Sequence, residues 1–79
     1  MSPGIGLMKR RLETEESATS LAISGITKKF KVEPNEIECL ETKYDNDSGD
    51  WYVALGLKDK KAVIRMDSVQ AVILEINEI

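Results

Sequence analysis

The sequence predicts a small α+β domain in which one N-terminal helix packs on an antiparallel meander of three or four strands. Two observations predict this fold. Residues 14–31 carry their apolar side chains on one broad arc at helical spacing. Three later runs then alternate apolar with polar side chains, as strands do: 36–44, 51–57 and 61–66. With 79 residues the chain forms one domain with a thin core.

The helix has a recognisable start, apolar face and end. Thr14 is the expected N-cap, because its hydroxyl can accept a hydrogen bond from a first-turn amide. Ala18, Ala22 and Gly25 lie in the middle of the apolar arc, which indicates a close approach to a flat neighbour such as a sheet. Pro34 cannot continue a helix, so the chain turns before it.

The strands predict two apolar faces. If Tyr44 lies opposite Trp51, one face of the sheet receives the helix. Segment 68–77 fits both helical and strand spacing, and its Val and Ile content favours a strand. A one-residue bulge would invert that strand. The second face is then expected to carry Ile37, Cys39, Val63, Val72, Leu74 and Ile76.

So many apolar side chains on one face of a small protein require a cover. We expect a second copy of the chain to meet this face about a twofold axis, giving a homo-oligomer. The alternative cover is the N-terminal segment 1–11, which Pro3, Gly4 and Gly6 mark as a flexible arm. Its apolar side chains are Ile5, Leu7 and Met8. Residues 12–79 form the domain proper.

Composition excludes several function classes. The chain has no histidine, which removes the usual general base and the commonest metal ligand, so we expect no enzyme. Its single cysteine cannot form an internal disulfide, which favours a cytoplasmic location. The net charge of −3 argues against nucleic acid as a partner. No run approaches the length of a membrane helix, and we expect no membrane partner.

The acidic run 45–50 is the one candidate for site chemistry. Asp45, Asp47 and Asp50 offer the oxygen ligands that Ca²⁺ or Mg²⁺ prefers. The same residues are common turn formers, so a solvated hairpin turn is the other interpretation. No further cofactor is expected.

The order of elements resembles two related groups of proteins. The run 51–53 (WYV) and Asp67 are similar to the aromatic middle strand and the hairpin Asp of the PepSY-type module. The runs 49–51 (GDW) and 67–75 (DSVQAVILE) resemble the gas-vesicle accessory protein O family. Either resemblance implies a non-catalytic interaction module. We therefore predict a small protein-interaction module that self-associates through a sheet face, with divalent-cation binding by the acidic run as the alternative.

Overall fold

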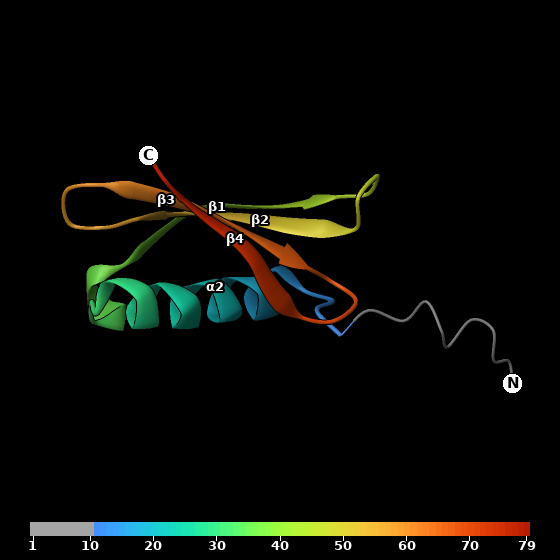
Figure 1. The fold of residues 1–79 in the computed structure, drawn as a ribbon, viewed down its shortest axis with the longest axis horizontal. Coiled ribbons are helices and arrows are strands. Elements are labelled where there is room, and N and C mark those ends of the chain that lie inside the picture. The colour runs from blue at the N-terminus through green and yellow to red at the C-terminus, as the bar shows by residue number, and fades with distance from the viewer. Residues whose placement is uncertain (1–10) are drawn as a thin grey trace, which may run out of the picture.

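Figure 1 shows a computed structural model of the chain, which describes residues 11–79. One helix precedes a four-stranded sheet whose strands follow one another in space as in the sequence, each antiparallel to the next. This arrangement confirms the predicted helix on an antiparallel meander. The elements are α2 (Glu15–Phe30), a 3-10 turn η1 (Pro34–Glu36), β1 (Glu38–Asp45), β2 (Asp50–Gly56), β3 (Lys61–Asp67) and β4 (Val72–Glu78).

Helix α2 begins and ends where its sequence predicts. Thr14 Oγ1 accepts a hydrogen bond from the backbone N–H of Ser17 at 3.0 Å, which satisfies a first-turn amide. Lys31 adopts a left-handed conformation with φ of 57° and ends the helix before Pro34. Within residues 11–79, no helix is long and apolar enough to cross a membrane.

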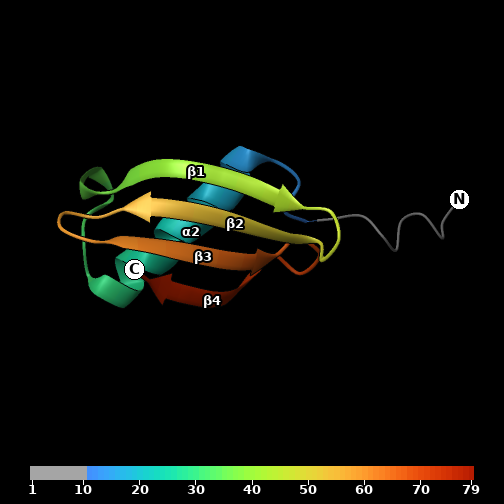
Figure 2. The same cartoon turned by 90° about the horizontal axis from the view of Figure 1, so that it is seen from above.

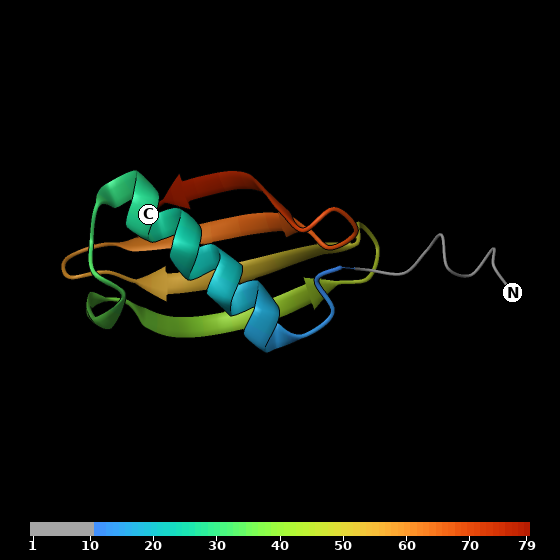
Figure 3. The same cartoon turned by 90° about the horizontal axis from the view of Figure 1, so that it is seen from below.

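Helix α2 crosses one face of the sheet diagonally (Figures 2 and 3). Its first half lies over β1, where the Thr19 and Thr42 hydroxyl oxygens are 2.9 Å apart. Its second half lies over β4, where Gly25 packs so closely on Ile73 that a Cβ at position 25 would clash with the Ile73 Cδ1. The small residues of the apolar arc therefore let α2 lie close to the sheet, as the sequence predicts.

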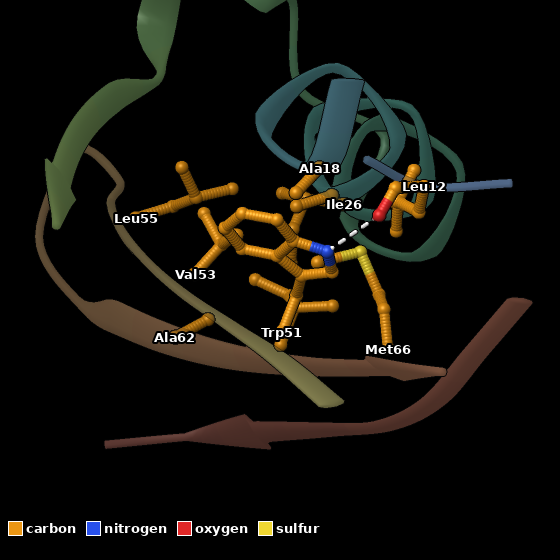
Figure 4. Packing of buried hydrophobic residues seen from close by; sticks show 10 residues of the cluster. Leu12, Ala18, Ile26, Trp51, Val53, Leu55, Ala62 and Met66 are labelled. Atoms are coloured by element: carbon orange, nitrogen blue, oxygen red, sulfur yellow. Dashed lines mark hydrogen bonds between the residues drawn. The ribbon is translucent and has the colours of Figure 1, made fainter. Parts of the chain in front are cut away.

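The core lies between α2 and the two central strands (Figure 4). The Trp51 indole ring lies in this layer, and its Nε1–H donates to the Leu12 carbonyl oxygen at 2.8 Å. This bond joins the chain before α2 to the sheet. The buried apolar side chains are Leu12, Ala18, Ala22, Ile26, Trp51, Val53, Leu55, Ala62, Ile64 and Met66.

Ser68 joins three segments at one end of the sheet and is fully buried. Its hydroxyl donates to the Gly49 carbonyl oxygen at 2.6 Å. Its carbonyl oxygen accepts from the backbone N–H groups of Arg11 and Leu12, each at 3.0 Å. Arg11 is the one described residue of the predicted arm 1–11; the rest, with Ile5, Leu7 and Met8, lies outside the described residues.

The ambiguous segment 68–77 is a turn followed by a strand, which confirms the strand interpretation. Both outer strands carry a bulge. In β1, Cys39 pairs with Leu55 and Glu41 pairs with Ala54, so Leu40 is left unpaired. In β4, the pairing likewise passes over Leu74. Each bulge shifts the alternation of its strand by one residue.

Overpacking tests the close approach of α2. Ala22 is fully buried against the sheet, so Ala22→Leu is expected to destabilise the domain by about 1–3 kcal/mol. Ser24→Leu, on the exposed side of the same helix, is the matched control and is expected to change the free energy of unfolding by less than about 0.5 kcal/mol. Denaturant unfolding measures both, and equal midpoints for the two variants would contradict close packing.

Candidate interaction surface

The sheet face that points away from α2 is the open face. In β2, Val53 is buried under the helix, so its neighbours Tyr52 and Ala54 point to the other side. The pairing of the strands extends this side into two central rows. One row is Glu41, Ala54, Val63 and Asn77, and the next is Lys43, Tyr52, Arg65 and Glu75.

The middle of the open face is apolar and hollowed. Tyr52, Ala54 and Val63 are half-buried although no element of residues 11–79 lies over them (Figure 1). Together with Glu41 and Lys43 they line a shallow hollow of about 130 Å³. An apolar centre with charged side chains beside it is the usual anatomy of a protein–protein contact.

Arg65 is held in place on the open face by two carboxylates. Its Nε lies 3.3 Å from Asp50 Oδ2, and its Nη1 lies 3.8 Å from Glu75 Oε1. Among the described residues, its Nε–H finds no acceptor with hydrogen-bond geometry, so its attraction to Asp50 is electrostatic. In the sheet register, Arg65 is the partner of Tyr52 in β2.

The two bulges add apolar side chains at the borders of the open face. The Leu40 side chain lies over Gly56, where a Cβ would be 3.5 Å from Leu40 Cδ2. Leu40 is 44% exposed and Leu74 is 48% exposed, large fractions for leucines. Val72, at the start of β4, is also exposed.

The structure divides the predicted second face into two groups. Val63, Val72 and Leu74 are not covered by α2, as predicted. The other three residues were placed wrongly: Ile37 and Ile76 pack against the core, and Cys39 points toward Thr19 of α2. The bulges explain why Cys39 and Ile76 face α2. Each bulge shifts the alternation of its strand by one residue, so side chains expected on the open face lie on the helix face.

Sequence reasoning also missed three apolar residues of this surface. Tyr52 and Ala54 could have been found, because strict alternation with Trp51 and Val53 places them opposite the core. Leu40 had no such signal, since its position depends on the bulge.

Cys39 and the threonines near it form a small polar groove between α2 and β1. The groove has a volume of about 390 Å³ and is lined by Glu15, Glu16, Thr19, Ser20, Cys39 and Thr42. The exposed Cys39 thiol lies 3.5 Å from the Thr42 hydroxyl oxygen, which also meets Thr19. These groups satisfy one another, and the described lining has no basic side chain to activate the thiol.

The acidic run forms a tight hairpin turn. Asp45 Oδ1 accepts from the Asp47 backbone N–H and Oδ2 accepts from the Ser48 hydroxyl, both at 3.1 Å. The Asp45 carbonyl oxygen accepts from Gly49 N–H at 2.8 Å, and Gly49 has the positive φ of 75° that closes the turn. Asp50 points instead to Arg65. In the part of the chain that the structure describes, no group of three His, Cys, Asp or Glu side chains is placed to hold a metal ion.

A calcium titration tests the alternative function. Because Asp45 is engaged in the turn and Asp50 in the pair with Arg65, we expect millimolar Ca²⁺ to leave the amide resonances of residues 45–50 and the melting temperature unchanged. Sodium chloride at the same ionic strength is the control. A saturable shift confined to residues 45–50 would show that the run binds a cation.

Comparison of the chain with family models, with curated proteins and with solved structures gives no significant match. The resemblance to the PepSY-type module and to the gas-vesicle accessory protein O family therefore stays a prediction. The function of the chain has to be inferred from the geometry of its open face.

Proposed function

We propose that this chain is a small non-catalytic protein-interaction module that self-associates through the open face. The observation that carries the proposal is the uncovered apolar centre formed by Tyr52, Ala54 and Val63. In a domain of this size a single helix covers one face, so a second apolar area gains its cover most readily from another molecule.

Charges favour a second copy as the partner. The open face carries side chains of both signs in its two central rows, Glu41 and Lys43 on β1 and Arg65 and Glu75 on the other side. A face with both signs can oppose each charge with its opposite when it meets itself, as a twofold contact requires. A strongly acidic or basic face would repel its own copy.

The bulges favour the face over the sheet edges as the contact. A regular outer strand presents free N–H and C=O groups that can pair with another chain. In this sheet the unpaired Leu40 and Leu74 interrupt both outer strands. Such interruptions are a common way to prevent edge-to-edge pairing. Association is therefore proposed to occur by stacking of faces, in the reducing cytoplasm that the lone Cys39 suggests.

A charged substitution in the middle of the open face tests the proposal. Val63 is half-buried there and has no role under α2, so Val63→Glu is expected to leave the fold intact. The buried glutamate charge would face the second copy and disfavour association. Light scattering or sedimentation at micromolar concentration is expected to give twice the 8.8 kDa chain mass for the wild type and the single mass for Val63→Glu.

The matched control adds the same charge to the opposite side of the domain. Ser20→Glu, on the exposed surface of α2, is expected to keep the mass of the wild type. Circular dichroism checks that both variants are folded. A wild type that stays at 8.8 kDa at all concentrations, or a Val63→Glu variant that associates like the wild type, would refute the proposal.

A further inference from the structure

The charges of the domain are distributed unevenly between its two ends. One end of the domain holds the start of α2, the β1–β2 turn and the β3–β4 turn (Figure 3). At this end the Leu12 backbone N–H donates to the Ser68 carbonyl oxygen. Among residues 11–79, the basic side chains at this end are Arg11 and Arg65, which pairs with Asp50, and the other charged side chains are acidic. They include Glu15, Glu16, Asp45, Asp47, Asp50 and Asp67.

The opposite end is close to neutral and rich in lysine. It holds the end of α2 and the β2–β3 turn, where Lys60 Nζ lies 4.7 Å from the centre of the Phe30 ring. Acidic side chains lie among the lysines, and the Oε2 of one of them, Glu78, is 3.1 Å from Lys60 Nζ. The lysines at this end are Lys28, Lys29, Lys31, Lys58, Lys60 and Lys61.

Two orientations of a twofold axis keep the strands of two stacked open faces aligned. An axis parallel to the strands places β1 over β4 of the second copy and the acidic end over the acidic end. An axis perpendicular to the strands reverses the ends and places each strand over its own copy. The first orientation brings together two groups of like charges, whose repulsion opposes association.

We propose that the second copy stacks on the open face about a twofold axis perpendicular to the strands, so that Glu41 of each copy opposes Lys43 of the other. This inference rests on the proposed self-association. Glu41 and Lys43 are exposed and lie in the two adjacent central rows of β1. An axis between these rows brings the two residues together twice by symmetry.

The same operation matches other parts of the face. On β3 it carries Lys61 toward Asp67 of the second copy, since they occupy the first and last rows. On β2 it carries Tyr52 over Ala54 of the second copy, where the hollow of about 130 Å³ can receive the phenol ring. The same axis places Glu38 opposite Asp45 of the second copy at a corner of the face. Because each sheet is twisted, the corners of two stacked sheets diverge, and this divergence increases the distance between the two carboxylates.

Charge reversal with mixing tests the orientation. In Lys43→Glu, positions 41 and 43 of β1 both carry a carboxylate. In Glu41→Lys, both positions carry an ammonium group. Each single variant therefore repels its own copy, and we expect its dissociation constant to rise about 10- to 100-fold. In an equimolar mixture, both Glu–Lys contacts are restored between the two variants. Sedimentation is expected to show a mixed dimer with an affinity close to that of the wild type.

A second double variant distinguishes the two axes. With an axis parallel to the strands, Lys43 would oppose Glu75 of the second copy, so Lys43→Glu would be rescued by Glu75→Lys in the same chain. We expect no rescue from that combination. Ser24→Glu, on the exposed side of α2 and outside both charged ends, controls for an added negative charge and is expected to keep the wild-type affinity.

The outcomes separate the orientation from the association itself. A wild type that dimerises while the mixture of single variants stays monomeric overturns the orientation and leaves self-association standing. Rescue by Glu75→Lys overturns it in favour of the parallel axis. A wild type that is monomeric at all concentrations overturns both.

Discussion

One helix can cover one face of a four-stranded sheet, and the rest of this structure follows from that constraint. The small residues Ala18, Ala22 and Gly25 let α2 lie close to the sheet, so a thin core forms between them. The Trp51 indole fills that layer and binds the Leu12 carbonyl oxygen, which fixes the start of the helix on the sheet. The second face is left with Tyr52, Ala54 and Val63 at its centre and no cover from residues 11–79.

The two bulges decide which residues belong to each face. In β1 and β4 a single unpaired leucine shifts the alternation, so that Cys39 and Ile76 turn toward the helix while Leu40 and Leu74 are exposed. The bulges also interrupt the outer strands, which makes the edges poor templates for pairing. The uneven charge of the two ends then favours a stack in which the ends are reversed. Core packing, edge protection and electrostatics thus all support the proposed association through the open face.

The helix and the strand order could be predicted from local signals. Thr14 is a cap in the sequence and in the structure, and Tyr44 lies opposite Trp51 as expected, with ring centres 5.1 Å apart. The membership of the open face could be predicted for Val63, which lies in a strand of regular alternation. It could not be predicted for Ile76, because a bulge arises from the pairing of two strands and leaves no mark in the residues of one.

Contacts between copies test the central claim most directly. Isotope-filtered nuclear Overhauser spectra of a mixture of labelled and unlabelled chains detect proton pairs that are close across an interface. Stacking of open faces with the ends reversed predicts intermolecular signals between the Tyr52 ring and the Ala54 methyl group. Intermolecular signals that arise from α2 or from the outer edges of β1 and β4, with none from Tyr52, would contradict it.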